Sequence, residues 1–259
     1  MNKLEKQLQQ IKNRKRIGLM THVVIGYPTL EKTIKIVRTM AKNGVDFIEL
    51  QIPFSDPLAD GPTIMRACEK SLANGTKVKD AFEIMKLLSS QVSIPLLFMG
   101  YYNTVFKYGI QQFCQDAKNA GATGLIFPDF SIDEEKQEHF LSYCGKYDLY
   151  NIQVISPVTT DNRLKKNAKV ATGFVYCAAH QGITGAKDEM NPFISSYLKR
   201  IKKYFSIPLA VGFGISKKNH IESLATQADI IVIGSALIKE IDRGGLNGVE
   251  NFIKNLTVK

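Results

Sequence analysis

The chain has 259 residues, of which 44% are hydrophobic, and a formal net charge of +10. This length and apolar content suit one large core, so a single domain spanning residues 1–259 is expected. The positive charge comes from lysines spread along most of the chain, without a long basic run interleaved with aromatics, and nucleic acid is therefore not an expected partner. The excess charge would help to attract an anionic substrate.

The N-terminus predicts a short leading helix, because Leu4, Leu8 and Ile11 follow helical spacing and no apolar signal-peptide region lies behind them. The most apolar stretches, residues 94–100 and 230–238, are too short or too interrupted to span a bilayer, so no membrane role is expected. The four cysteines are widely separated and form no C-x-x-C pair, which favours reduced thiols in a cytoplasmic protein.

Short apolar, β-rich runs recur at intervals of roughly thirty residues, and each is followed by an amphipathic stretch, as in repeated βα units around a parallel sheet. The expected strands are residues 19–25, 45–52, 95–101, 124–127, 151–155, 173–177, 208–211 and 230–233. The expected helices include residues 30–43, 78–88, 110–119, 134–144, 195–204, 218–226 and 249–256. Eight regular units with no G-x-G-x-x-G after the first strand favour an α/β fold of the closed (β/α)8 TIM-barrel type over an open doubly wound sheet.

Two strand-to-helix connections are long, at residues 53–63 and 178–192, and they are βα loops 2 and 6 of the expected barrel. The βα loops of a barrel all lie at the carboxyl end of its strands, which is where function usually sits. The site is therefore expected at this end.

Carboxylates gather after the second strand. Glu49 lies two residues from Phe47 and from Gln51, so the three share one face of the strand, and Glu49 is expected to point into the barrel. Partial desolvation there raises the pKa of a carboxyl group toward the range useful for proton transfer. Asp56 and Asp60 follow in a proline-stiffened loop, so three acids share one opening. The alternative roles are an internal ion pair for Glu49 and turn formation or helix capping for the aspartates.

Glycines mark the last two strand ends. The sequences VGFGIS at residues 211–216 and IGSA at residues 233–236 each open into a helix whose free N–H groups can hold an anion. Two such loops after the seventh and eighth strands predict a phosphate site, although tight turns are the alternative. The sequence GITG at residues 182–185 offers further amides and a hydroxyl, or a flexible lid. No H-x-x-x-H motif or matched cysteine pattern predicts a metal site.

These motifs resemble the tryptophan synthase α-subunit family nearly end to end. The resemblance rests on PFSDPLADGPTI after the second strand, YYNTVFKYG after the third, GLIFPDF at the fourth, GFVYCAAHQGITG at the sixth, VGFGIS at the seventh and VIGSA at the eighth. Members of that family are (β/α)8 barrels that split indole-3-glycerol phosphate into indole and glyceraldehyde 3-phosphate by a retro-aldol reaction, without a cofactor. They pass indole to a β subunit that carries pyridoxal phosphate, in an α2β2 heterotetramer.

The resemblance implies a role for each carboxylate. Glu49 would protonate the indole carbon and help to remove the glycerol hydroxyl proton, while Asp60 would stabilise the positive charge at the indole nitrogen. Tyr176 would border the indole and help to place Glu49, and Thr184 would orient Asp60 when loop 6 closes. A proton donor at carbon and an anion beside nitrogen are the charges that this bond cleavage needs.

The resemblance also implies a set of binding residues. The phosphate ligands would be Gly185, Gly214, Gly234 and Ser235. Tyr101 and Phe213 would be further substrate-binding residues. Pro53 and Asp56 lie on the loop that resembles the family's β-subunit contact.

Four positions depart from the family's pattern. Gln51 stands where many members have Gly, and His22 stands where an aromatic residue often lines the indole site. Thr104 replaces a Pro that often follows Asn, and Ala179 replaces a common Ser. None of these changes removes a group with a chemical role, although His22 and Gln51 can alter the polarity of the pocket.

Three other functions compete with this one. They are a non-catalytic activator that docks on a β subunit, an indole-releasing lyase that is active alone, and an unrelated phosphate-binding barrel such as a sugar-phosphate epimerase. Retention of Glu49, Asp60 and Tyr176 argues against the non-catalytic activator. Release of indole, with and without a β subunit, separates the others.

Overall fold

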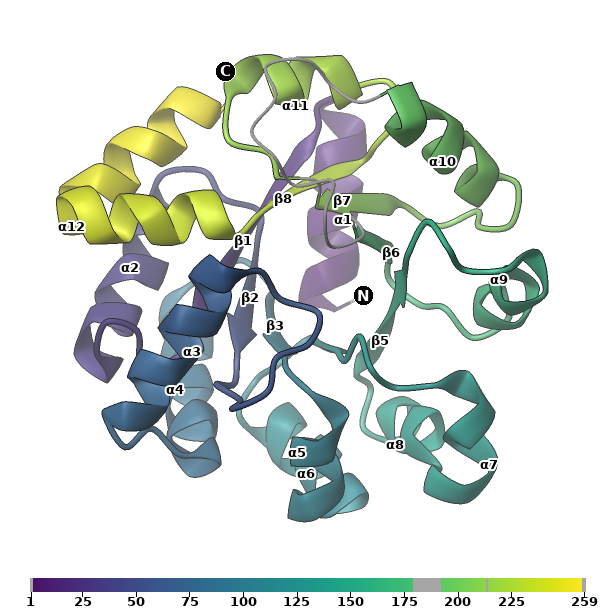
Figure 1. Cartoon of the computed structure of the whole chain (residues 1–259), viewed down its shortest axis with the longest axis horizontal. Helices are drawn as coiled ribbons and strands as arrows, with labels where there is room; N and C mark the ends of the chain where they lie inside the picture. Colours follow the sequence, from purple (N-terminus) through teal and green to yellow (C-terminus); the bar gives the residue numbers. More distant parts are fainter. Residues whose placement is uncertain (1, 179–191, 213, 258–259) are drawn as a thin grey trace.

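A computed structural model describes residues 2–178, 192–212 and 214–257. Eight parallel strands pair in chain order, and the eighth pairs with the first, so the sheet closes into a barrel (Figure 1). The strands are β1 (Gly18–Val24), β2 (Phe47–Gln51), β3 (Leu96–Met99), β4 (Gly124–Ile126), β5 (Tyr150–Ile155), β6 (Val175–Ala178), β7 (Leu209–Gly212) and β8 (Ile230–Ile233). The expected (β/α)8 barrel is confirmed, and every predicted strand overlaps an observed one.

Helices surround the barrel (Figure 1). They are α1 (Lys3–Asn13), α2 (Leu30–Lys42), α3 (Pro62–Ala73), α4 (Val78–Gln91), α5 (Tyr102–Tyr108), α6 (Ile110–Asn119), α7 (Glu135–Glu138), α8 (Phe140–Lys146), α9 (Asp161–Ala168), α10 (Pro192–Lys202), α11 (Lys218–Leu224) and α12 (Ser235–Leu256), with a short 3-10 turn at Ile132–Glu134. The sequence did not predict α3, α5 or α9. Each of these helices comes after a strand, and the connection before it contains Pro, Asp, Tyr or Thr. Such residues are typical of turns, so the sequence pattern does not show where the helix begins.

Two predicted helices have different bounds in the structure. The continuous helix expected at residues 134–144 is wrong, because the chain turns into a left-handed conformation at His139 and separates α7 from α8. The Glu135 carboxylate accepts hydrogen bonds from the backbone N–H groups of Leu141 and Ser142, and so caps α8 from outside it. The last helix, α12, begins well before the expected residues 249–256 and bends at Gly245, whose positive φ interrupts the helical pattern.

Strand side chains alternate between two environments. Phe47 and Phe174 point into the barrel, where they belong to one buried cluster and their rings lie 6.0 Å apart. The neighbours of Phe47 along the strand, such as Ile48 and Leu50, belong instead to the layer between the barrel and its helices. The core therefore has an inner part that fills the barrel and an outer part that attaches the helices.

The predicted N-terminal helix is confirmed as α1, which closes the amino end of the barrel (Figure 1). Its Leu4 and Ile11 join the inner cluster. The Arg16 guanidinium makes two hydrogen bonds, of 2.5 and 2.6 Å, to the buried Asp46 carboxylate, which also accepts the Leu19 N–H at 2.9 Å. One carboxylate thus connects the segment after α1 to β1 and to the start of β2.

The cysteines occupy packing positions. All four, Cys68, Cys114, Cys144 and Cys177, are buried with free thiols in the layer between the barrel and its helices. The four cysteines thus act as small apolar residues, and their free thiols agree with the expectation of reduced thiols. In the part of the chain that the structure describes, no helix is long and apolar enough to cross a membrane.

The Asp46 contacts predict a large effect on stability. The substitution Asp46→Ala is expected to lower the free energy of unfolding by about 2–3 kcal/mol, because it leaves the Leu19 N–H without an acceptor and the Arg16 guanidinium unpaired. The value is below that for a fully buried ion pair because the Arg16 side chain is 29% exposed. Urea unfolding followed by circular dichroism measures this change.

The control for this measurement is Glu31→Ala, which removes an exposed ion pair with Lys35 on α2 and is expected to leave stability unchanged. Equal effects of the two substitutions would contradict the structural role of Asp46.

Candidate active site

Glu49 lies in the barrel interior near the carboxyl end of β2, two residues beyond Phe47, and is 1% exposed. The register of β1 and β2 pairs it with His22, and 3.0 Å separates Glu49 Oε1 from His22 Nδ1. Tyr176, which lies two residues beyond Phe174 on β6, donates its O–H to the same Oε1 at 3.3 Å. The other carboxylate oxygen, Oε2, is buried without a hydrogen-bond partner among the described residues.

Asp60 is the second buried carboxylate, with 6% exposure, and it lies in the loop between β2 and α3. Its Oδ2 accepts hydrogen bonds from the Gln51 amide nitrogen at 2.6 Å and from the Tyr101 hydroxyl at 3.0 Å. Tyr101 is itself fixed, since its oxygen accepts the Ala59 N–H at 3.0 Å and its ring stacks on Phe54. Asp60 therefore has a defined position although it belongs to a loop.

His22 and Gln51 join the two carboxylates. His22 Nε2 lies 2.8 Å from the Gln51 amide oxygen, while the Gln51 nitrogen faces Asp60. The resulting hydrogen-bonded network, called the carboxylate network below, runs through Tyr176, Glu49, His22, Gln51, Asp60 and Tyr101. The sequence identified His22 and Gln51 only as departures from a family pattern. Strand alternation contained the missing signal, because it places both on the inner face with Glu49.

Burial and charge act in opposite directions on His22. Burial disfavours the charged ring and lowers its pKa, but the hydrogen bond to Glu49 and the negative charges of Glu49 and Asp60 outweigh it, and the net pKa of His22 is raised. Burial, followed by the nearby carboxylates, raises the pKa of Tyr176 and Tyr101, so both tyrosines remain hydrogen-bond donors at neutral pH. Glu49 and Asp60 thus favour the protonated form of the buried His22 ring.

The start of α12 opens beside the carboxylate network. Gly234 caps this helix and Ser235 is its first residue, so the first N–H groups of a long helix point to the carboxyl end of β8. A Cβ added at Gly234 would lie 3.5 Å from the Cβ of His22, which shows how closely the two segments approach. Gly214, after β7, has a φ of +67° that suits glycine. These glycines can hold an anion next to the carboxylates.

The remaining predicted site residues differ in their burial and contacts. Pro53 is buried, whereas Asp56 is exposed and its carboxylate accepts a hydrogen bond from Ser55, so Asp56 acts as a turn residue and does not join Glu49 and Asp60. Of the three acids, the structure joins Glu49 and Asp60 in one network and leaves Asp56 outside it. Four further positions lie outside the described residues, namely Ala179, Thr184, Gly185 and Phe213.

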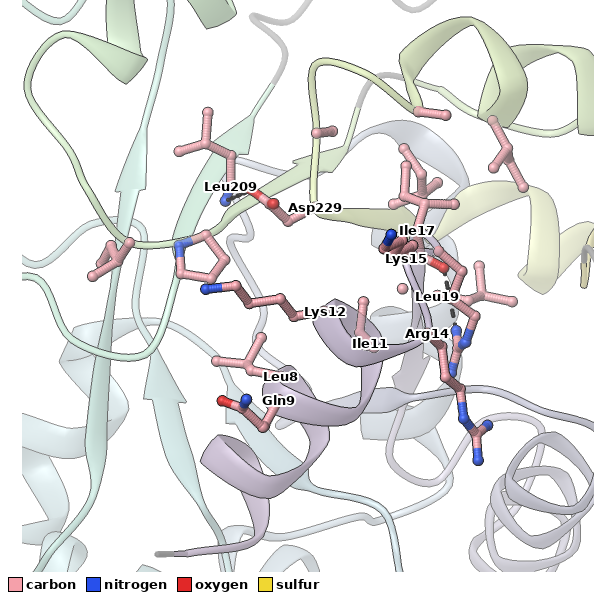
Figure 2. A pocket seen from close by; sticks show the side chains of 18 of the residues that line it. Leu8, Gln9, Ile11, Lys12, Arg14, Lys15, Ile17, Leu19, Leu209 and Asp229 are labelled. Carbon is pink, nitrogen blue, oxygen red and sulfur yellow. Dashed lines mark hydrogen bonds between the residues drawn. The ribbon is translucent and has the colours of Figure 1, made fainter.

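Cavity size alone does not identify the site. A cavity of about 400 Å³ at the carboxyl ends of β4 to β6 is bordered by Leu58 and Ala59 of the loop that carries Asp60. A larger one, of about 1500 Å³, lies at the opposite end of the barrel, where Figure 2 shows Lys12 of α1 facing Leu209. No residue of the carboxylate network lines either cavity, but the smaller one lies at the same end of the barrel as the network and borders the loop that carries Asp60. The position of the carboxylates, and not the cavity volume, therefore decides between the two ends.

Metal binding finds no support in the side chains that the structure describes. None of their His, Cys, Asp and Glu groups form a set of three or more that could hold an ion. The carboxylate network instead has the parts of an acid–base site. One Glu49 oxygen is left without a partner, and the other lies within hydrogen-bond distance of both His22 and Tyr176.

Comparisons with known proteins place the chain among relatives of similar length. The sequence model of the tryptophan synthase alpha chain family matches residues 8–259. A tryptophan synthase alpha chain from Desulfotalea psychrophila is 45% identical over 253 residues, which cover 98% of this chain and 99% of the relative. One from Caldanaerobacter subterraneus subsp. tengcongensis is 39% identical over 261 residues, which cover 99% and 98%.

The fold of the chain is also similar to that of solved tryptophan synthase chains. The tryptophan synthase of Mycobacterium tuberculosis has a chain that superposes with a TM-score of 0.91 at 30% identity, over 98% of this chain and 96% of that one. The tryptophan synthase subunit alpha of Legionella pneumophila str. Paris superposes with a TM-score of 0.90 at 30% identity, over 99% and 97%.

The raised pKa of His22 predicts how stability depends on pH. Because the folded chain binds this proton more tightly than the unfolded chain, the stabilisation is fully present below the ordinary His pKa of about 6.5 and is lost as pH rises through the raised pKa. The difference in free energy of unfolding between the wild-type chain and His22→Asn should therefore decrease above pH 6.5, by about 1.4 kcal/mol for each unit by which the pKa is raised. Urea unfolding from pH 6 to 9 measures it, and a constant difference would contradict the assignment.

Proposed function

The chain belongs to the tryptophan synthase alpha chain family, whose members are lyases that cleave indole-3-glycerol phosphate, and we propose that Glu49 and Asp60 carry out this cleavage. One observation supports the proposal above the others. Two buried carboxylates from different segments lie in one hydrogen-bonded network, and Glu49 Oε2 is left without a partner. A buried carboxylate oxygen with no partner is costly unless a bound molecule uses it.

The reaction assigns two proton transfers to Glu49. Glu49 Oε2 gives its proton to the indole carbon that carries the glycerol chain, which places a positive charge on the ring. The hydroxyl proton of the adjacent carbon then returns to Oε2, the carbon–carbon bond breaks, and its electron pair passes to the ring. Indole and glyceraldehyde 3-phosphate result, and Glu49 ends in its initial state. Tyr176 and His22 hold Oε1 and so keep Oε2 toward the substrate.

Asp60 stabilises the positive charge that develops at the indole nitrogen. An anion fixed beside this nitrogen stabilises the protonated ring more than it stabilises the neutral substrate, and a group of this kind accelerates the reaction. Gln51 and Tyr101 both donate to Oδ2 of Asp60, so the carboxylate is held in place before the substrate arrives.

The glycine loops bind the other end of the substrate. Gly214, Gly234 and Ser235 would hold the phosphate through backbone N–H groups at the start of α12 and after β7. We assign Gly185 to the same phosphate, Thr184 to the orientation of Asp60, and Phe213 with Tyr101 to the indole side of the pocket. Proton transfer between carboxylates and substrate needs no cofactor, and pyridoxal phosphate is assigned only to the partner subunit.

The chain works with a β subunit, as its family does. We assign the contact with the β subunit to the carboxyl end of the barrel, in an α2β2 assembly. Both proteins are proposed to be cytoplasmic, and residues 1–259 of this chain to form a single domain. Apolar side chains are well exposed in two βα loops, with Leu58 at 83% and Val158 at 69%, and on the short helix α5 after β3, with Phe106 at 58%. Leu58 belongs to the same loop as Pro53 and Asp56, so partner contact at this loop would reach Asp60 directly.

The proposed roles predict a graded loss of indole release. The substitution Glu49→Gln removes the proton at Oε2 and should lower kcat by about 10³-fold or more, while Asp60→Asn removes an anion and should lower it by about 10²-fold. Release of indole from indole-3-glycerol phosphate, without serine and with and without the β subunit, measures both. The matched control is Glu83→Gln on the exposed side of α4, which should leave kcat unchanged.

Two outcomes would contradict the assignment. Normal turnover by Glu49→Gln would exclude its role as acid and base. No indole from the wild-type complex would favour a non-catalytic activator or an unrelated phosphate-binding barrel.

A further inference from the structure

His22 and Gln51 form a bridge between the two reacting carboxylates. His22 Nδ1 faces Glu49 Oε1 at 3.0 Å, and His22 Nε2 faces the Gln51 oxygen at 2.8 Å. The nitrogen of Gln51 then reaches Asp60 at 2.6 Å. All four side chains are buried, and backbone pairing places His22 beside Glu49. The bridge is therefore fixed by the barrel itself.

Asp60 determines which way the Gln51 amide faces. An ionised carboxylate can only accept hydrogen bonds, so the atom that approaches Asp60 Oδ2 must be the amide nitrogen. The reversed amide would bring its oxygen against the carboxylate and its nitrogen against His22. With the amide in the observed orientation, its oxygen faces His22 Nε2, and an amide oxygen accepts only. Nε2 of His22 must therefore carry a hydrogen.

This constraint leaves His22 two forms. In the neutral ring, the single hydrogen is on Nε2, and the lone pair of Nδ1 faces the Glu49 carboxylate, which is repulsive. In the charged ring, both nitrogens carry hydrogen, and His22 donates to Glu49 and Gln51 together. Gln51 thus excludes the neutral form that has its hydrogen on Nδ1. His22 can donate to Glu49 only as an imidazolium.

The surroundings of His22 favour this charged form. Glu49 on β2 and Asp60 in the following loop are the negative groups that act on the ring. Tyr176 on β6 reaches Glu49 and not His22, and on the β8 side the backbone of Gly234 lies against the Cβ of His22. Asp60, together with Glu49 once Oε2 has given up its proton, makes a buried positive charge at His22 electrostatically favourable.

We propose that His22 is a positioning residue for Glu49, held as an imidazolium by Gln51, whose amide Asp60 orients. Its Nδ1–H holds Glu49 Oε1 so that Oε2 faces the substrate. The catalytic consequence rests on the proposed lyase function. When Oε2 gives its proton to the indole carbon, the positive ring stabilises the carboxylate that remains, until the hydroxyl proton returns to Oε2. His22 keeps both of its hydrogens throughout, so no further proton donor is needed.

Two substitutions of His22 separate this role from simple packing. An Asn side chain places an amide nitrogen where the imidazole Nδ1 stands, so His22→Asn keeps a donor to Glu49 that does not titrate. His22→Leu keeps apolar volume but removes the donor. His22→Leu should lower kcat by about 10–100-fold with KM changed by less than about threefold, and His22→Asn should recover most of this loss.

The pH dependence of kcat provides the readout that packing would not move. The wild-type complex with the β subunit should lose activity as pH rises and His22 becomes neutral. His22→Asn should lack this decline, because its donor remains at every pH. The matched control is His139→Asn, at the left-handed junction of α7 and α8, where Asn adopts the same backbone conformation and the decline should be preserved.

A second measurement does not depend on activity. In the full chain labelled with ¹⁵N-histidine, His22 should show hydrogen on both ring nitrogens at neutral pH and hydrogen on Nε2 alone at higher pH, with its signals identified by their loss in His22→Asn. Gln51→Met removes the acceptor at Nε2 and should allow hydrogen on Nδ1 in the neutral ring. If the wild-type chain released no indole while these spectra appeared as expected, the lyase function would fail and the bridge would stand.

Three results would overturn the proposal. They are a neutral His22 ring with hydrogen only on Nδ1 in the wild-type spectrum, a basic decline of kcat that persists in His22→Asn, and unchanged kcat in a folded His22→Leu chain. Thermal unfolding of each variant, followed by circular dichroism, establishes that it is folded.

Discussion

The alternation of side chains along parallel strands, combined with the register of β1 and β2, determines where Glu49, His22 and Gln51 lie. On β2 the inner positions are Phe47, Glu49 and Gln51, and the register pairs Glu49 with His22 on β1. Moving from the amino to the carboxyl end of the barrel, the inner face changes from apolar packing to a polar network. The same geometry that fills the core thus places Glu49 at the carboxyl end of the barrel, where the proposed substrate site lies.

Charges buried in this way have to be balanced. Glu49 and Asp60 are both nearly inaccessible to water, and two unpaired carboxylates in such a site would be strongly unfavourable. His22, Gln51, Tyr101 and the hydroxyl of Tyr176 supply the donors, and His22 supplies a positive charge. Glu49 Oε2 is the carboxylate oxygen that the network leaves without a partner. The network therefore satisfies the buried carboxylates and leaves one oxygen of Glu49 for the proposed substrate.

The fold was predictable because its strands are continuous apolar runs separated by helical stretches, and all eight predicted strands were found. The helices were less predictable. The PLADGP segment before α3 reads as a turn. The left-handed break at His139 and the capping of α8 by Glu135 lie inside a stretch whose apolar spacing is helical, so the pattern did not show them. For the site, residue pattern and family resemblance identified Glu49 and Asp60. They did not identify the bridge through His22 and Gln51, because its existence depends on pairing between strands more than twenty residues apart.

In the proposed reaction the indole ring lies between Glu49 and Asp60, and the phosphate lies at the start of α12. A crystal structure of the Glu49→Gln chain with indole-3-glycerol phosphate tests this most directly. The expected result has the amide of the substituted side chain within hydrogen-bond distance of the reacting part of the substrate, the ring nitrogen against the Asp60 carboxylate, and the phosphate on the backbone N–H groups of Gly234 and Ser235. Substrate bound at the amino end of the barrel, in the cavity beneath α1, or with its ring away from Asp60, would contradict the account.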